Sequence, residues 1–133
     1  MAKGSCLCKG VEIDTKVDPQ ATVACSCTSC QACSASAFTI NLVFPKDTVD
    51  ITKGKEHVKV FKEKADSGRD VFRHFCDTCG NAIYTLAADG TCFVKAPVLK
   101  GALHNDPVAH IFTRNLPTWA EGVKTGDRKR DGA

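Results

Sequence analysis

Eight of the nine cysteines in this 133-residue sequence lie in short clusters. The densest cluster runs from Cys25 to Cys33 and contains four thiols in nine residues. The other clustered thiols form two pairs, Cys6 with Cys8 and Cys76 with Cys79. In a reducing compartment such spacings are typical of metal sites or redox centres, because disulfides rarely persist there. The sequence therefore predicts metal binding or thiol chemistry.

The two pairs predict one closed metal site. In Cys76-x-x-Cys79 the spacing lets both sulfurs face one ion, and the glycine that follows permits a turn whose backbone N–H groups point at the sulfurs. Cys6-x-Cys8 is a tighter turn, which a glycine also follows. Each pair supplies two thiolates, and a structural zinc ion takes four ligands in a tetrahedron. The expected ligands of this structural zinc are Cys6, Cys8, Cys76 and Cys79.

The central cluster predicts a second site of a different kind. Cys25-x-Cys27-x-x-Cys30 supplies three thiolates, and no further cysteine pair is left to complete a set of four. Three protein ligands leave an open position on the ion, which separates a catalytic zinc from a structural one. In the alternative, Cys33 is a fourth ligand that closes the site. Zinc is favoured over an iron–sulfur cluster because these thiolate sets suit a redox-silent ion, although the sequence alone also allows iron.

Short alternating segments must position these thiols, and they predict a mostly antiparallel β domain. The expected strands cover residues 11–13, 21–24, 36–44, 49–51, 57–61, 70–75, 82–87, 91–95 and 107–112. One hairpin is expected between 49–51 and 57–61, and a second across the Asp89-Gly90 turn. The central cluster then forms a loop or a single helical turn between two strands. No helix longer than a turn or two is predicted.

Other residues carry weaker signals. Cys92 lies within an expected strand, where a buried thiol acts as a small hydrophobic side chain. His110 stands alone on a strand, which is more typical of a hydrogen-bonded structural group than of a ligand. The aromatic residues expected in the core or in a pocket wall are Phe38, Phe72, Phe75 and Trp119. The cations that could meet substrate carboxylates, but that more commonly face solvent, are Lys95, Lys100 and Arg114.

Length and composition indicate one globular domain over residues 1–133, with a core of about 4–119 and a polar tail at 124–133. The formal charge of +3 would fall to about zero if seven thiolates bound two divalent ions. Nucleic-acid binding then loses its electrostatic support, and Arg128-Lys129-Arg130 is interpreted as a solvated end. No segment reaches the roughly 20 apolar residues of a membrane span or has the apolar region of a secretory signal, which predicts a cytoplasmic protein.

Four motifs occur in a characteristic order along the chain. They are Gly4-Ser-Cys-x-Cys-x-Gly-Val, Cys25-x-Cys-x-x-Cys, Phe75-Cys-x-x-Cys-Gly, and His110-Ile111 with Trp119. From about Gly4 to Trp119 the chain resembles the glutathione-dependent formaldehyde-activating enzyme family, which also includes centromere protein V. Where that family commonly has a basic residue and then a glycine after the third central cysteine, this chain has Gln31 and Ala35.

The resemblance implies a zinc-bound, Mss4-like β-tent fold. It also implies that the two pairs hold the structural zinc, and that a second, catalytic zinc is held by Cys25, Cys27 and Cys30. Together, residues and resemblance predict a carbon–sulfur lyase with two zinc ions per chain, which acts on a glutathione-like thiol adduct of a small carbonyl or other electrophile. Two alternatives stay open: a non-catalytic structural zinc domain that binds a protein partner, and a thiol redox or metal-handling protein.

Overall fold

The computed structural model describes residues 1–123, 128, 129, 131 and 132, which form two β-sheets and one short α-helix. The strands are β1 (Lys3–Ser5), β2 (Glu12–Thr15), β3 (Ala21–Cys25), β4 (Thr39–Phe44), β5 (Val49–Lys53), β6 (Val58–Lys64), β7 (Asp70–Cys76), β8 (Ala82–Leu86), β9 (Cys92–Lys95), β10 (Ala109–Ile111) and β11 (Arg128–Lys129). The helix is α1 (Thr28–Ser34), and the 3-10 turns are η1 (Lys55–His57), η2 (Ala96–Val98), η3 (Ala102–His104), η4 (Thr113–Asn115) and η5 (Thr118–Ala120). The predicted mostly β class is confirmed.

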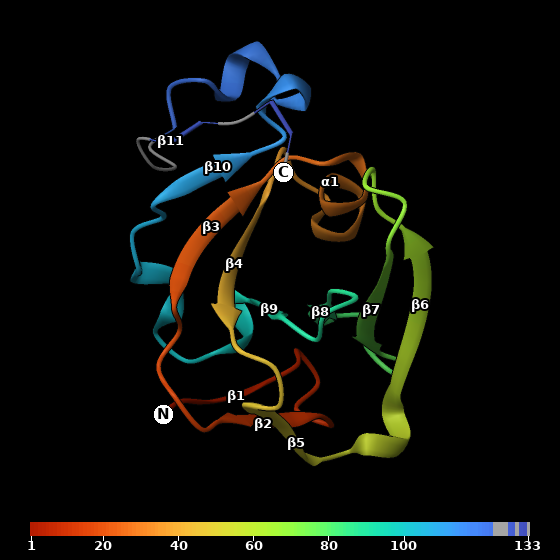
Figure 1. Ribbon diagram of the computed structural model, residues 1–133. Coiled ribbons are helices and arrows are strands. Elements are labelled where there is room, and N and C mark those ends of the chain that lie inside the picture. The colour runs from red at the N-terminus through yellow and green to blue at the C-terminus, as the bar shows by residue number, and fades with distance from the viewer. Residues whose placement is uncertain (124–127, 130, 133) are drawn as a thin grey trace.

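The larger sheet has the strand order β11-β10-β3-β4-β9-β8-β7-β6 and curves strongly. In Figure 1 it passes from β10 and β3 at the left, through β9 and β8 at the back, to β7 and β6 at the right. Its strands are antiparallel except at β10, which pairs in parallel with β3 and β11. The expected hairpin of β8 and β9 is confirmed, with Thr85 opposite Phe93. Of the expected polar tail, the backbone of Arg128–Lys129 pairs with β10, while Arg130 lies outside the described residues.

The expected hairpin between residues 49–51 and 57–61 is wrong. β5 pairs with β2 in a three-stranded sheet of order β1-β2-β5, whereas β6 pairs with β7 at the edge of the larger sheet. The segment from Gly54 through η1 carries the chain from one sheet to the other. Alternation along a segment predicts a strand but not its partner, because pairing depends on which buried face the strand covers.

The hydrophobic core lies between the small sheet and one face of the large sheet. Ile13 of β2, Phe44 of β4 and Val94 of β9 are fully buried within it. Cys6 and Cys76 belong to the same buried cluster. The first set of candidate ligands therefore adjoins the core.

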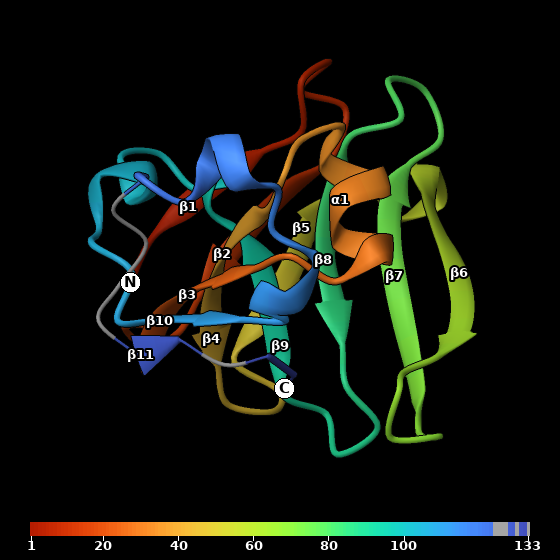
Figure 2. The ribbon, with the colours of Figure 1, turned by 90° about the horizontal axis from the view of Figure 1, so that it is seen from above.

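The concave face of the large sheet carries buried polar side chains. Alternation along β4 places Leu42 in the core and Asn41 on the opposite face, and along β9 it separates Val94 from Lys95 in the same way. Figures 1 and 2 show α1 beside one end of β7, where it helps to cover this face. The enclosed polar face is where the second set of candidate ligands lies.

The helix α1 follows β3 directly and spans about two turns. Its N-cap is Cys27, whose sulfur accepts a hydrogen bond from the backbone N–H of Cys30 at 3.3 Å. The side chain of Gln31 donates to the carbonyl oxygen of Asn115 at 2.9 Å and so ties the helix to the C-terminal segment. The helix ends at Ser34, and the cap residue Ala35 adopts a left-handed conformation with φ 49° and ψ 42°. Glycine is the usual residue for this cap position.

We predict that Ala35→Gly stabilises the protein by about 0.5–1 kcal/mol, because the left-handed conformation penalises a side chain with Cβ by roughly that net amount. The matched control is Ala32→Gly inside α1, which should destabilise by about 1 kcal/mol. Urea denaturation followed by circular dichroism measures both changes. Destabilisation by both substitutions would contradict the assigned cap.

We predict that Gly4→Ala costs about 1–3 kcal/mol of stability. A Cβ at Gly4 would lie 2.0 Å from the carbonyl oxygen of Val98, so β1 would have to move away from its bridge with Leu99. Gly122→Ala is the control, because a Cβ there meets nothing within 4 Å. Equal urea midpoints for both variants would show that this close approach does not constrain β1.

Candidate metal centres and the adjoining cavity

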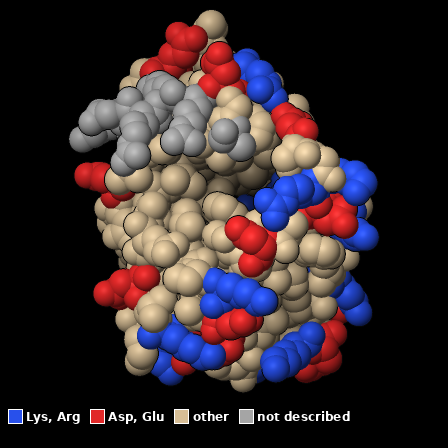
Figure 3. All heavy atoms as spheres, viewed as in Figure 1, with Lys and Arg blue, Asp and Glu red and all other residues tan. Residues whose placement is uncertain are grey.

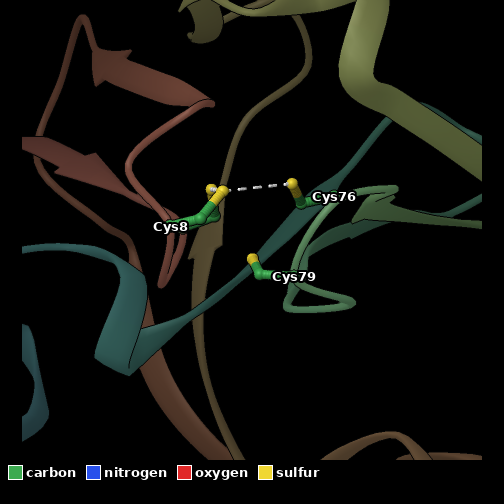
Figure 4. Close-up of side chains that lie close together, drawn as sticks. Cys8, Cys76 and Cys79 are labelled. Carbon is green, nitrogen blue, oxygen red and sulfur yellow. Dashed lines mark hydrogen bonds between the residues drawn. The ribbon is translucent and has the colours of Figure 1, made fainter.

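The first set of thiols joins two segments that are far apart in the sequence. Figure 4 shows Cys8, from the turn between β1 and β2, facing the turn between β7 and β8. The Sγ atom of Cys8 lies 3.6 Å from that of Cys6 and 3.8 Å from that of Cys76. The backbone N–H of Leu7 donates to the Asn81 side chain at 2.9 Å, which links the two turns a second time. The sulfurs that lie within 4.8 Å of one another are those of Cys6, Cys8, Cys76 and Cys79.

Backbone N–H groups surround these sulfurs. The N–H of Val11 donates to the Cys6 sulfur at 3.3 Å. Backbone N–H groups of Cys8 and Asn81 hydrogen-bond the Cys79 sulfur and lower the pKa of that thiol to about 6. Such donors favour thiolates, and four thiolate donors are what a closed tetrahedral zinc site takes. The donor set therefore fits a structural metal ion.

The second set forms where β3 passes into α1. The sulfurs of Cys25, Cys27 and Cys30 all lie within 4.8 Å of one another. Cys25 ends β3, Cys27 caps the helix, and Cys30 is the buried residue of its first turns. Three soft donors fit a zinc ion that keeps a further position open. The two clusters that the spacing predicted are thus brought together in space.

Cys33 is not part of this second set. Its side chain is exposed on α1, and its sulfur accepts a long hydrogen bond from Nη1 of Arg73 at 3.9 Å. The same guanidinium nitrogen lies 4.0 Å from the Cys30 sulfur. Within the part of the chain that the structure describes, the set consists of three sulfurs rather than four.

A cavity of about 230 Å³ adjoins the three sulfurs. Its apolar walls include Val23, Val71 and Phe93 from strands of the large sheet. Its polar lining includes Lys95 and Thr85, and the buried Thr85 hydroxyl is without a hydrogen-bond partner among the described residues. The three thiols therefore face a cavity that is open to solvent on one side and large enough for a small molecule.

Lys95 was named as a cation that could meet substrate carboxylates, whereas Arg73 and Glu63, which also line the cavity, were not named from the sequence. Lys95 was expected to face solvent, but only 7% of it is exposed, and its ammonium donates to Oδ1 of Asn41 at 2.9 Å. Its place in the sequence, two residues after Phe93 on the same face of β9, is the signal that could have indicated an inward orientation. By contrast, Lys100 and Arg114 are exposed, as expected.

A half-buried ion pair lies at the cavity wall. The Nε of Arg73 on β7 donates to a carboxylate oxygen of Glu63 on β6. The other carboxylate oxygen of Glu63 accepts a hydrogen bond from the Ser29 hydroxyl of α1 at 3.1 Å. These two interactions hold the Arg73 guanidinium between α1 and the edge of the large sheet.

The three thiols of the second set strongly influence one another. The pKa of Cys30 lies far below that of an ordinary thiol because Cys25 and Cys27 hydrogen-bond its sulfur, with smaller contributions from the Lys95 charge and the Thr39 hydroxyl. The pKa of Cys25 is raised because its hydrogen bonds to Cys27 and Cys30, together with burial, favour the protonated thiol. Metal binding requires deprotonated thiols, so an ion here would release these shared protons.

The remaining sequence expectations are mostly confirmed. Cys92 is buried in the core, and desolvation raises its pKa to about 12, as for an inert thiol. His110 is fully buried, with its Nε2 2.6 Å from the Ser26 hydroxyl oxygen. Phe38 packs edge-on against that imidazole. The expectation for Trp119 is wrong, because 77% of this residue, which lies in η5, is exposed.

Two further observations concern the surface. None of the described helices is long and apolar enough to cross a membrane. On the face shown in Figure 3, acidic and basic side chains are interspersed, so charge of one sign does not dominate that face.

Known proteins share both the sequence pattern and the fold. A crystal structure of a Rhodobacter sphaeroides protein superposes with a TM-score of 0.61 at 20% sequence identity, covering 74% of this chain and 88% of that chain. At this identity the similarity shows the fold. The sequence profile described as glutathione-dependent formaldehyde-activating enzyme matches residues 1–115. With both cysteine clusters inside the matched region, the chain belongs to the glutathione-dependent formaldehyde-activating enzyme family.

Proposed function

We propose that this protein is a zinc-dependent lyase that makes or breaks the carbon–sulfur bond between a glutathione-like thiol and a small carbonyl compound. The observation that carries the proposal is the set of three sulfurs, Cys25, Cys27 and Cys30, beside a cavity of about 230 Å³. Cys33 stays outside this set, so the protein supplies three ligands where a tetrahedral ion takes four.

The two thiol sets have different proposed roles. The four sulfurs of the first set would hold a structural zinc ion and the three of the second set a catalytic one. A zinc ion at the second set would lower the pKa of a thiol that binds it, so that the thiolate dominates near neutral pH.

Residues of the cavity would bind and orient the substrate. Lys95 and Arg73 place positive charge at the cavity, which suits the carboxylates of a glutathione-like thiol or the oxygen of a carbonyl group. Glu63 and its hydrogen bond from Ser29 hold the guanidinium in place. The apolar walls would exclude water, which strengthens electrostatic interactions inside the cavity.

The proposed reaction needs no oxidant or reductant. In the forward direction the thiolate sulfur bonds to the carbonyl carbon, and the proton released from the thiol ends on the former carbonyl oxygen. In the reverse direction the carbon–sulfur bond breaks and the proton returns to sulfur. The chain must therefore supply a thiolate-stabilising site and an environment that stabilises charge on oxygen.

The direct test is turnover. With two equivalents of zinc, the protein should accelerate adduct formation between glutathione and formaldehyde, measured by NMR exchange spectroscopy. Cys27→Ser should remove most of this acceleration, while Cys92→Ser, at a buried thiol outside both sets, should retain it. A two-zinc protein that leaves the exchange rate unchanged would contradict the lyase and favour a structural zinc domain.

The proposed division of roles makes a second prediction, about stability. Cys79→Ser removes a ligand of the set that adjoins the core and should cost at least about 3 kcal/mol, which lowers the Tm by more than about 10 °C. Cys27→Ser should lower the Tm by much less, because its set lies on the opposite face of the sheet. Calorimetry of both zinc-loaded variants gives the comparison, and equal losses of Tm would show that the division is wrong.

A further inference from the structure

Three polar side chains on the cavity side of β4 and β9 are more than nine-tenths buried. Thr39 is 5% exposed, Asn41 4% and Lys95 7%. Burying an ammonium group costs free energy unless it is hydrogen-bonded or its charge is compensated. Apolar side chains would be the usual occupants of such buried strand positions. The hydrogen bonds of these three polar side chains must therefore account for their burial.

The three side chains form a hydrogen-bonded chain. Asn41 and Lys95 are directly opposite each other on neighbouring strands. The Lys95 ammonium donates to Oδ1 of Asn41 at 2.9 Å, and Nδ2 of Asn41 donates to Oγ1 of Thr39 at 3.0 Å. Thr39 is in turn directly opposite Cys25, which places its hydroxyl next to the three sulfurs.

The direction of every hydrogen bond in the chain is determined. An ammonium group only donates, so Asn41 must present its oxygen to Lys95 and its NH₂ group to Thr39. The Thr39 hydroxyl then accepts from Asn41 and keeps its own hydrogen for another acceptor. The three sulfurs lie beside this hydroxyl, because Thr39 is opposite Cys25, and the hydroxyl contributes to the lowered pKa of Cys30.

We propose that Lys95, Asn41 and Thr39 are positioning residues that hold the Cys30 thiolate as a metal ligand of the second site. Three thiolates around a divalent ion leave one negative charge, and Lys95 places a positive charge in the same buried region. This inference rests on the proposed function, because it requires a metal ion at the second site. Partners of this kind typically contribute tenfold to a hundredfold to metal affinity.

The first site lacks a comparable side-chain arrangement among the described residues and relies on backbone N–H donors to Cys6 and Cys79. At the second site the backbone N–H of Cys30 bonds the Cys27 sulfur, and the backbone N–H of Cys27 bonds the Cys25 sulfur. Among the described residues the donors near the Cys30 sulfur are side chains, namely Arg73, with Nη1 at 4.0 Å, and Thr39. This difference makes the second site selectively sensitive to substitutions on β4 and β9.

The test measures zinc release from the two-zinc protein to a chromophoric chelator. Cys27→Ser identifies the release phase of the second site, because that phase is absent in this variant. Thr39→Val and Lys95→Met should each accelerate the same phase by about tenfold or more and leave the first site unchanged. Thr39→Ser keeps the hydroxyl and should release zinc at the wild-type rate. The matched control is Thr85→Val, since Thr85 is a buried threonine on the same sheet face but outside the chain.

The double variant Thr39→Val with Lys95→Met shows whether the hydrogen-bonded residues act together or affect zinc release independently. If the residues act in series, the double variant should release zinc no faster than the faster single variant. Wild-type release rates in Thr39→Val and Lys95→Met, or acceleration equal to that of Thr85→Val, would overturn the inference while leaving the proposed function intact. A wild-type protein with one release phase would overturn both. Unchanged release from the first site shows that the variants are folded.

Discussion

The meeting of two cysteine turns at the edge of the core is the constraint on which the rest of the structure depends. Cys6 and Cys76 are buried in the same hydrophobic cluster, although 69 intervening residues separate them in the sequence. Four sulfurs this close would repel one another as thiolates unless a cation offset their charge. The cluster joins the small sheet to the large one, and the core lies between them. Metal–ligand bonds at this cluster would therefore restrain both sheets.

The two faces of the curved large sheet have different roles, one in stability and the other at the candidate site. One face packs the core, and the concave face encloses a cavity with cations and three sulfurs. Alternation along β4 and β9 serves both faces, because every second residue points to the other side. Polar groups on the concave face can be buried since most of them are hydrogen-bonded, as Lys95 is to Asn41 and Arg73 to Glu63. Lys95 and Arg73 also place positive charge near the Cys30 sulfur.

Much of the fold followed from local patterns. The nine expected strand segments, the hairpin of β8 and β9 and the short helix at the central cluster agree with the alternation and turn residues, whereas β1 and β11 were not expected. The partner of β5 did not follow, because two strands that are adjacent in sequence can each cover a different buried face. The exposure of Trp119 was also missed, since an aromatic residue signals burial only when some element lies over it. These errors concern contacts between distant segments.

The sequence by itself determined which cysteines group together, because ligand spacing is a local property of turns that aim two or three sulfurs at one point. It also determined the family and the β class. Only the tertiary structure decided that Cys33 lies outside the second set, because the helical path of α1 turns that side chain outward. Likewise, only strand pairing placed Lys95 beside Asn41 and thereby within the buried surroundings of the three thiols. Charge and burial at a site depend on residues brought together from several strands, and the sequence of one segment does not contain that information.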